Sequence, residues 1–366
     1  MKVTAITRAK LILLSICLSS IFATGCISVK QEKDTARLLK TETATQATLM
    51  NEVNRFSRVD SMRAKMDLKF EDTSFAEFGL KEEYRNADGE VVVQRPGKIL
   101  LKVQAPFIKT DIAQMTSDGE TFRVAILNDG GSGKYKKFVK GTNNADYSRL
   151  QQTIGVSDPA ANGANGKNGK VVTQNVNAFA NLRPQHFTDA MLVRPIDEAN
   201  IYTQSTIFEL EEDAKVAKRS PLRKIMRGYY MLDEFTRQSA GGLRIARRFW
   251  FDRVGGIRLA RQQIFDDNGE IESDIIYGRE GNLTETGNFV NLPLEIQVTR
   301  PKEKYSMKLT YQSPAAVTIG TTFPQTAFVL LNSWNLEEVD LDKRLAEASI
   351  DQPTSKSNKT AVTRFQ

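Results

Sequence analysis

Alternation of apolar and polar residues between positions 61 and 71 constrains the fold of this chain more than any other feature of its sequence. Every second residue of this run is apolar, and the residues between them are polar. The apolar set is Met62, Ala64, Met66, Leu68 and Phe70. Successive side chains of a strand point to opposite faces of a sheet, so a period of two predicts a strand with one buried face.

Less regular versions of this pattern recur along most of the sequence. They predict further strands at 78–84, 99–103, 122–127, 201–210, 225–232, 243–251, 257–265, 271–277, 289–298 and 305–311. The dipeptides Asp88-Gly89, Asp118-Gly119 and Asn268-Gly269 lie between extended runs and supply the positive φ that tight hairpins need. We therefore predict a mainly β (α+β) fold built on an antiparallel sheet, in which consecutive strands are neighbours.

Helical patterns interrupt the predicted sheet. Residues 35–56 contain neither Gly nor Pro, and Leu39, Leu49, Val53 and Phe56 are spaced to share one face of an amphipathic helix. Two shorter helices are predicted at 178–193 and 325–334. Each is short enough to act as a plug or a lid over the sheet.

The first 26 residues have the order of a bacterial export signal: basic residues, a short apolar run, then small residues before a cysteine. The ending Ala23-Thr24-Gly25-Cys26 resembles the lipobox of bacterial lipoprotein signals, although Ala23 stands where leucine is usual. The resemblance implies cleavage before Cys26, with lipid on its thiol and on its new amino group. Because Ile27 rather than aspartate follows, it also implies anchoring in the outer membrane, facing the periplasm. The alternative is an ordinary signal peptide with an incidental cysteine.

Cysteine usage and charge exclude several function classes. Cys17 leaves with the signal and lipid consumes Cys26, so no thiol remains for a disulfide, a nucleophile or a metal site. Loss of the signal leaves 48 basic and 44 acidic residues, dispersed along the chain, which does not favour nucleic-acid binding. The predicted organisation is a signal peptide at 1–25, a lipidated tether at 26–34, a single domain at 35–345 with a mobile loop near 157–170, and a disordered tail at 346–366.

Motifs for catalysis or for metal binding fail on their spacing. The glycine-rich run at 130–134 is followed by Tyr135, where a phosphate loop needs Ser or Thr. The acidic run at 266–270 lacks the alternating ligands of a calcium loop. His186 is the only histidine, and packing at the start of a helix is the commoner explanation for it. We therefore predict a protein that is not an enzyme and that has no cofactor and no metal site.

Arginines alternate with aromatic residues in the predicted strand at 243–251. Arg244, Arg247 and Arg248 are the basic residues of this strand. The pattern is superficially like a platform for single-stranded nucleic acid, which a periplasmic address excludes. Two interpretations remain: the arginine stems pack along the sheet, or the guanidinium groups contact anionic lipid head groups.

Residues 61–127 resemble the LolA/LolB superfamily of lipoprotein carriers and receptors. The resemblance rests on a helix that leads into the strand at 62–70, on Arg95-Pro96-Gly97 entering the next strand, on Pro106-Phe107 and on Ser117-Asp118-Gly119. It implies an unclosed, curved half-barrel whose concave face is covered by an N-terminal helix and by inserted helices. It also implies a cavity between sheet and helices that takes acyl chains.

Flexible apolar side chains on the predicted inner face suit a shape-tolerant cavity. The expected lining is Met62, Met66, Leu68, Phe70, Leu101 and Val103, although such a face is ordinary core in most proteins. We predict a lipoprotein that binds acyl chains or lipoproteins and assists their delivery. The alternatives are an envelope scaffold that holds a protein partner without a lipid cavity, and a hydrolase, for which no acid pair has convincing spacing.

Overall fold

The computed structural model describes residues 35–72, 82–83, 87–105, 110–128, 136–145, 147, 183–239, 241–281 and 292–350. The predictions for residues 1–34, Cys26 among them, and those for Pro106-Phe107, for the loop near 157–170 and for residues 351–366 lie outside the described residues. The chain divides into two compact units. The first comprises Met1–Leu38 and Leu210–Met226 and is called the hairpin unit here. The second comprises Leu39–Glu209 and Arg227–Gln366 and is called the sheet unit.

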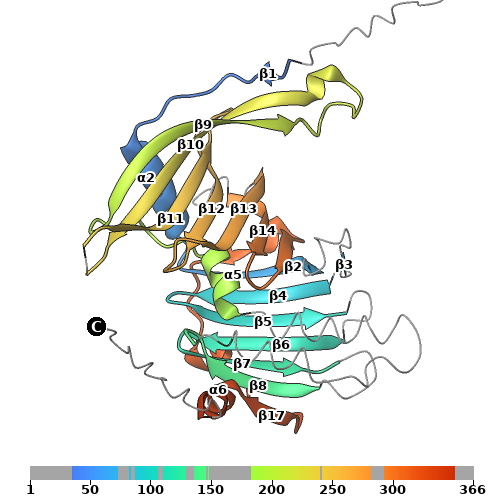
Figure 1. Cartoon of the computed structure of the whole chain (residues 1–366). Helices are drawn as coiled ribbons and strands as arrows, with labels where there is room; N and C mark the ends of the chain where they lie inside the picture. Colours follow the sequence, from blue (N-terminus) through green and yellow to red (C-terminus); the bar gives the residue numbers. More distant parts are fainter. Residues whose placement is uncertain are drawn as a thin grey trace, which may run out of the picture. The chain divides into compact units, whose positions relative to one another are not determined.

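The described residues form seventeen β-strands and three α-helices (Figure 1). In the first half of the chain the strands are β1 (Arg37–Leu38), β2 (Ser61–Asp72), β3 (Glu82–Glu83), β4 (Ala87–Gln94), β5 (Lys98–Gln104), β6 (Asp111–Asp118), β7 (Thr121–Ile126) and β8 (Lys137–Thr142). In the second half they are β9 (Ile201–Glu212), β10 (Lys224–Arg237), β11 (Leu243–Asp252), β12 (Arg258–Phe265), β13 (Ile271–Gly281), β14 (Leu292–Arg300), β15 (Tyr305–Tyr311), β16 (Thr318–Ile319) and β17 (Glu337–Asp340).

Pairing joins these strands into one mostly antiparallel sheet. Strands β10 to β15 follow one another, β15 pairs with β2, and β2 pairs with β4, from which the order runs on to β8. At one edge β9 pairs with β10, and at the other β17 lies parallel to β8. Among the described residues the two edge strands do not pair with each other, so the sheet is unclosed, and the predicted fold class is confirmed.

Among the described residues, three α-helices accompany the sheet: α2 (Gln46–Ser57), α5 (Pro184–Met191) and α6 (Leu341–Ile350). Helix α2 buries Leu49, Val53 and Phe56, as the sequence predicts, but it begins at residue 46 rather than 35. The Thr45 hydroxyl caps it by accepting from the Thr48 N–H at 3.3 Å. A threonine side chain favours this position because its oxygen satisfies a free N–H of the first turn.

Other predicted boundaries need correction. Residues 346–350 belong to α6, so the tail does not begin at 346. The predicted helix at 325–334 is a single 3₁₀ turn at Gln325–Phe328. Helix α5 lies within the predicted range 178–193, of which residues 178–182 are outside the described part.

Asp88-Gly89 does not form a turn, contrary to the sequence prediction, but lies inside strand β4. A Cβ on Gly89 would come within 2.8 Å of Leu68 Cδ1, which lies over it on the inner face. The glycine is therefore used here for the space it leaves to a neighbouring side chain, and not for its ability to adopt a positive φ. At Gly119 and Gly269, by contrast, the backbone has positive φ in hairpin turns, as predicted.

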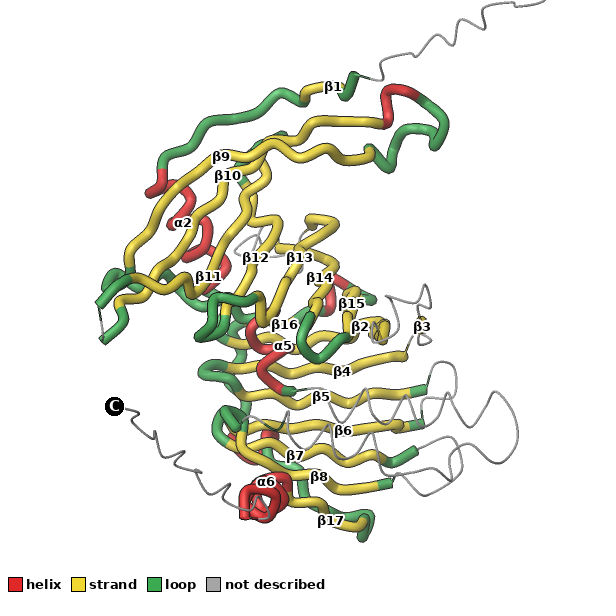
Figure 2. Tube along the Cα trace, viewed as in Figure 1, coloured by secondary structure: helices red, strands yellow, loops and turns green. Residues whose placement is uncertain are grey.

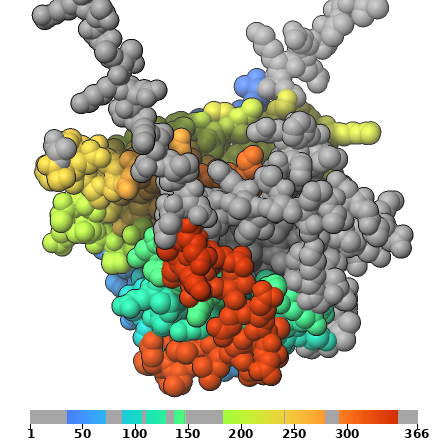
Figure 3. Space-filling view, turned by 60° about the horizontal axis from the view of Figure 1, so that its bottom comes forward, coloured from blue at the N-terminus to red at the C-terminus, as the bar shows by residue number. Residues whose placement is uncertain are grey.

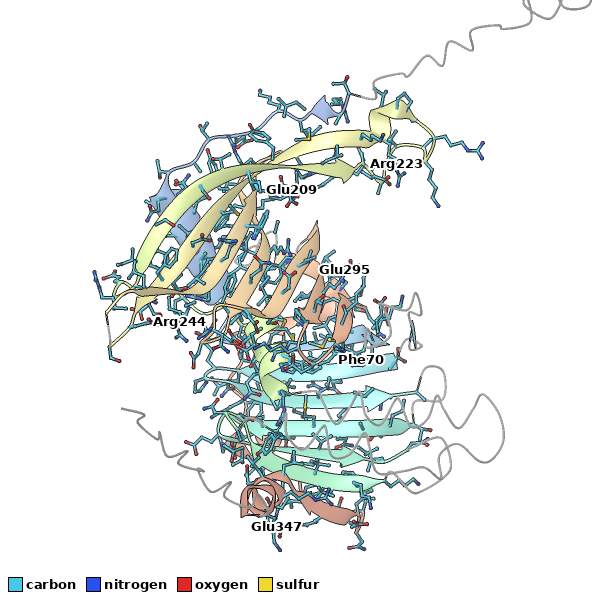
Figure 4. The ribbon with its side chains drawn as sticks, viewed as in Figure 1. Phe70, Glu209, Arg223, Arg244, Glu295 and Glu347 are labelled. Atoms are coloured by element: carbon cyan, nitrogen blue, oxygen red, sulfur yellow. The ribbon has the colours of Figure 1, made fainter. Side chains whose placement is uncertain are left out.

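The core lies on the inner face of the sheet unit, beneath α2 and α5. Leu68 stands opposite Ala87 on one neighbouring strand and Leu309 on the other. Leu101 stands between Val91 and Met115 in the same way. All of these residues belong to one buried apolar cluster that also includes the apolar faces of α2 and α5. Side chains around Phe70 are drawn in Figure 4.

The hairpin unit has its own short structure. Strand β1 pairs in parallel with the start of β10, with Arg37 opposite Ile225 and Leu38 opposite Met226. A turn containing the 3₁₀ helix Pro221–Arg223 joins β9 to β10 and appears in red at the end of the hairpin in Figure 2. The prediction of one domain over 35–345 stays a prediction.

The last part of the sheet unit covers the edge at β8. Lys137 and Lys140 of β8 form ion pairs with acidic residues of β17. In α6, Asp342 accepts hydrogen bonds from the Tyr147 and Thr142 hydroxyls. Figure 3 shows this C-terminal segment in orange and red, next to the green strands.

Candidate functional site

Helix α5 is buried on the inner face of the sheet unit although it has only eight residues. Pro184 occupies its first turn, where no backbone N–H is needed. Its apolar residues Phe187, Ala190 and Met191 are at most 6% exposed, and they belong to the main core cluster. The helix therefore covers the sheet with apolar side chains, as a plug or a lid would.

Two arginines hold the chain that follows α5. Arg95, in the turn between β4 and β5, donates from Nη1 to the Leu192 carbonyl at 3.4 Å and from Nη2 to the Val193 carbonyl at 2.7 Å. Arg247, on β11, donates from Nη1 and Nη2 to the carbonyls of Arg194 and Pro195, each at 2.8 Å. Four successive carbonyls are thus fixed by two guanidinium groups.

Arg95 also binds the C-terminal end of α2. Its Nη2 donates to the Ser57 carbonyl at 3.1 Å, and its Nε donates to the Val59 carbonyl at 3.2 Å. Carbonyls at the end of a helix have no partner within the helix, and a positive charge there is favourable. The side chain therefore joins α2, the β4–β5 turn and the segment after α5.

The start of α5 is held by His186. Its Nδ1 accepts from the Arg183 N–H at 3.3 Å and lies against the Tyr305 hydroxyl of β15. Burial, with Arg300 and Arg183 nearby, lowers the pKa of His186 well below 6.5. The ring is therefore neutral at physiological pH and acts as a structural acceptor.

The other polar contacts of α5 are few. The Tyr277 hydroxyl donates to the Ala190 carbonyl at 3.2 Å, and the Gln185 side chain donates to the Asn143 carbonyl. Asp189 is half-buried, and burial raises the pKa of its carboxyl. Covering the sheet thus depends on apolar burial together with a small set of polar contacts, mostly near the helix ends.

A small cavity of about 20 Å³ lies where α2, α5 and the sheet meet. Its lining is Phe56, Val59, Met62, Ala190, Met191, Tyr277, Leu292, Pro293, Ile296 and Tyr311. A cavity of this size holds roughly one water molecule. This cavity is therefore too small to hold an acyl chain.

The six predicted lining residues are all on the inner face. Met62 lines the cavity, and its sulfur accepts from the Tyr311 hydroxyl at 3.2 Å. The other five lie in the same buried cluster, away from that lining, and none is more than 6% exposed. These five are Met66, Leu68, Phe70, Leu101 and Val103. A role for any of them in ligand binding stays a prediction.

The three predicted head-group arginines have protein partners. Arg247 is 4% exposed and pairs with the equally buried Glu234, besides the two carbonyls it binds, so it is not placed to reach a membrane. Arg248 forms a bidentate pair with Asp233 at 2.6 and 2.8 Å. Arg244 is partly exposed and pairs with Asp267. Head-group contact by Arg244 and Arg248 stays a prediction.

Arg95 is a site residue whose role the sequence does not predict. The Arg95-Pro96-Gly97 motif resembles a family pattern, but the pattern gives the arginine no role. Its partners are backbone carbonyls from residues 57–59 and 192–193, and carbonyls leave no mark in a sequence. The only sign of this role in the sequence is an arginine directly before the turn residues Pro96-Gly97.

The described residues contain no group of three or more His, Cys, Asp or Glu side chains arranged to hold a metal ion. In the same part of the chain, no helix has the length and apolar character needed to cross a membrane.

Comparisons with known proteins give structural likeness alone. No protein-family model matches the chain, and no curated protein is similar to it in sequence. A LolA superfamily protein from Nitrosomonas europaea matches 79% of this chain and 99% of its own, with 9% identity and a TM-score of 0.39. A DUF1329 family protein from Desulfovibrio piger matches 77% of this chain and 95% of its own, with 8% identity and a TM-score of 0.38. A protein domain from Vibrio parahaemolyticus, named for outer-membrane lipoprotein sorting, matches 77% of this chain and 94% of its own, also with 8% identity and a TM-score of 0.38.

Proposed function

We propose that the sheet unit is a non-catalytic binding module for acyl chains, in which α5 is a movable cover over the apolar inner face. The protein would be anchored through Cys26 in the outer membrane, facing the periplasm, and would assist delivery of lipid or lipoproteins. The observation that carries the proposal is the cavity at the junction of α2, α5 and the sheet, beside a helix whose following segment is fixed by Arg95 and Arg247.

Displacing α5 supplies the space that the cavity lacks. The helix buries Phe187, Ala190 and Met191 against the sheet. An acyl chain offers the same kind of contact, at about 0.8 kcal/mol for each buried methylene. One apolar surface can therefore replace another with a small net change in free energy. Met62 and Met191, both on the cavity, have the flexible side chains that adapt to such an exchange.

A fatty acid that bears a photoreactive group tests this proposal and locates the site. After irradiation, peptides that contain cavity-lining residues such as Met62, Ala190 and Ile296 should carry the label. Unlabelled palmitate should abolish that labelling. Labelling that palmitate does not reduce, or that falls only on exposed residues outside the cavity, would refute the proposal.

One observation favours a second candidate, the envelope scaffold. Apolar side chains are exposed in the segment before β17, where Leu331 is 74% and Trp334 is 39% exposed. Exposed apolar residues close together in a chain are typical of a surface that binds a protein. Crosslinking in cells at Leu331 would identify such a partner. A scaffold should still bind its partner when acyl-chain binding has been removed.

A further inference from the structure

The hairpin unit has an excess of positive charge at its turn. Five basic residues occur within ten positions, and Lys215, Lys218 and Arg219 among them are exposed. The full set is Lys215, Lys218, Arg219, Arg223 and Lys224. Figure 4 shows the Arg223 side chain at this turn. Such a cluster on a short hairpin creates a positive electrostatic potential in the solvent around the turn.

Acidic residues of the hairpin unit lie at the base of the turn, and two of them are paired within the unit. Glu212 accepts from Arg223 Nε at 2.8 Å, and Asp213 lies 3.6 Å from Arg37 Nη2. Over residues 37–38 and 210–226 there are six basic and three acidic residues, a net charge of +3. The exposed lysines and Arg219 therefore dominate the charge of the turn.

Apolar side chains are exposed beside these charges. Leu222 is 61% exposed within the turn, and Leu210 and Leu38 are 63% and 65% exposed further along the unit. Scattered apolar residues on a surface are normal, but leucine between lysine and arginine residues is the composition of segments that lie in a membrane interface. Lysine stems also extend toward the aqueous head-group layer while covering apolar surface.

The chain path connects this unit to the predicted lipid anchor. Strand β1, at Arg37 and Leu38, is paired with β10 inside the unit. Ten residues lie between Cys26 and Arg37, and this stretch of chain reaches at most about 40 Å when fully extended. A lipid on Cys26 therefore keeps the hairpin unit within that distance of the bilayer surface, whatever the arrangement of the sheet unit.

We propose that the hairpin unit is a second membrane contact, which binds the anionic phospholipid surface of the membrane that holds Cys26. Lys215, Lys218 and Arg219 attract phospholipid phosphate groups, and Leu222 enters the interface between head groups and acyl chains. The inference goes beyond acyl-chain binding by the sheet unit. It rests on the proposed anchor only for the choice of membrane, because the contact itself needs no covalent lipid.

Vesicle flotation tests the contact with residues 27–366, a chain that lacks the lipid but retains every described residue. Two kinds of vesicle are compared, phosphatidylcholine mixed with phosphatidylglycerol and phosphatidylcholine alone. The protein should float with the mixed vesicles at low salt, and high salt should release it. Removing one basic residue at a membrane surface weakens binding about fivefold. The variant Lys215→Glu/Lys218→Glu/Arg219→Glu should therefore lose at least tenfold in affinity.

A matched control changes the same number of exposed basic residues in the sheet unit: Lys65→Glu/Lys343→Glu/Arg344→Glu. This control should bind the mixed vesicles as the unchanged protein does. Leu222→Ala should weaken binding without changing its dependence on salt. Equal binding by the hairpin variant, equal loss in the control, or flotation that ignores phosphatidylglycerol would overturn the proposal. Labelling by the photoreactive fatty acid is measured on the same variants, so failure of one proposal is distinguishable from failure of the other.

Discussion

Arg95 and Arg247 come from strand regions far apart in the sequence, yet they bind four successive carbonyls, 192 to 195. Arg95 takes the first two from the β4–β5 turn, and Arg247 takes the last two from β11. The segment that leaves α5 is therefore fixed to both halves of the sheet unit. Any movement of α5 away from the inner face has its pivot here, or else breaks these bonds.

Replacing Arg95 with Leu should loosen the cover. The change removes donors from the carbonyls of Ser57, Val59, Leu192 and Val193, and it should lower the free energy of unfolding by about 3 kcal/mol. We expect a fluorescent fatty acid to associate faster with the variant than with the unchanged protein. Stopped-flow fluorescence measures the rate, and urea denaturation measures the stability.

The matched control for this change is Arg63→Leu. Arg63 is an exposed arginine of β2 that binds Glu90 through Nε and Nη2. Loss of a surface pair like this costs about 0 to 1 kcal/mol. Its effect on the association rate should be negligible. Equal acceleration in both variants would mean that general destabilisation, rather than release of α5, admits the probe.

Gly89→Ala should destabilise the sheet unit by about 1 to 3 kcal/mol, because the new methyl group would displace the fully buried Leu68. Gly278→Ala is the comparison, since the atom nearest to its added Cβ is Glu295 Oε1, at 3.7 Å. Thermal or urea unfolding of both variants measures the difference. If both changes lower the free energy of unfolding by the same amount, the close approach of Leu68 does not contribute to stability.

Stability should fall in mild acid because of His186. Its pKa is lowered by burial in the folded protein, whereas in the unfolded chain it stays near its ordinary value of 6.5. Below pH 6.5 the imidazole therefore binds a proton in the unfolded chain but not in the folded protein. Each further pH unit lowers the free energy of unfolding by up to about 1.4 kcal/mol. The contribution is lost progressively as pH falls from 7 toward 5 and is restored above 7.

The variant His186→Gln isolates that contribution, because an amide oxygen can still accept a hydrogen bond and does not titrate in this range. Urea unfolding at pH 7 and at pH 5.5 gives the change in the free energy of unfolding with pH for the unchanged protein and for the variant. The unchanged protein should lose more stability than the variant over this interval. Parallel losses would assign the acid sensitivity to groups other than His186.

Cys26→Ala should release the protein from the membrane fraction without unfolding it. The buried core cluster of the described residues begins at Leu49, so the core is formed by residues other than Cys26. Fractionation of cells that express the variant measures release, and circular dichroism of the purified protein checks its fold. If the variant complements a strain that lacks the protein, the anchor is dispensable for function.

Strand positions were predictable because a half-buried strand has apolar and polar residues in alternation, which is visible in the sequence. Strand β15 is found at 305–311, as predicted, and β11 and β12 differ from prediction by one residue at an end. Strand β4 was missed because Gly89 supplies space for Leu68, and a glycine in a sequence does not reveal which of its two uses applies. The sequence analysis also predicts no strand at β6, β8 or β17, or at the two-residue strands β1 and β16.

The site was less predictable than the sheet. Met62 lines the small cavity beside α2 and α5, whereas its predicted role in binding an acyl chain stays a prediction. For Arg247 the sequence leaves two interpretations, packing of its stem along the sheet and contact with lipid head groups, because alternation does not distinguish a buried face from an exposed one at a charged residue. Its partner Glu234 and the carbonyls of 194 and 195 are brought to it by pairing of β10 with β11 and by the path after α5.

The most direct measurement is the lipid content of residues 27–366 purified without detergent, because this chain has no covalent lipid to confuse the result. Organic extraction followed by mass spectrometry should recover an acyl-bearing lipid in about molar proportion to the protein. Arg95→Leu should change that amount, whereas Arg63→Leu should not. A protein that yields no lipid, and that shows no saturable binding of a fatty acid added afterwards, would contradict the account.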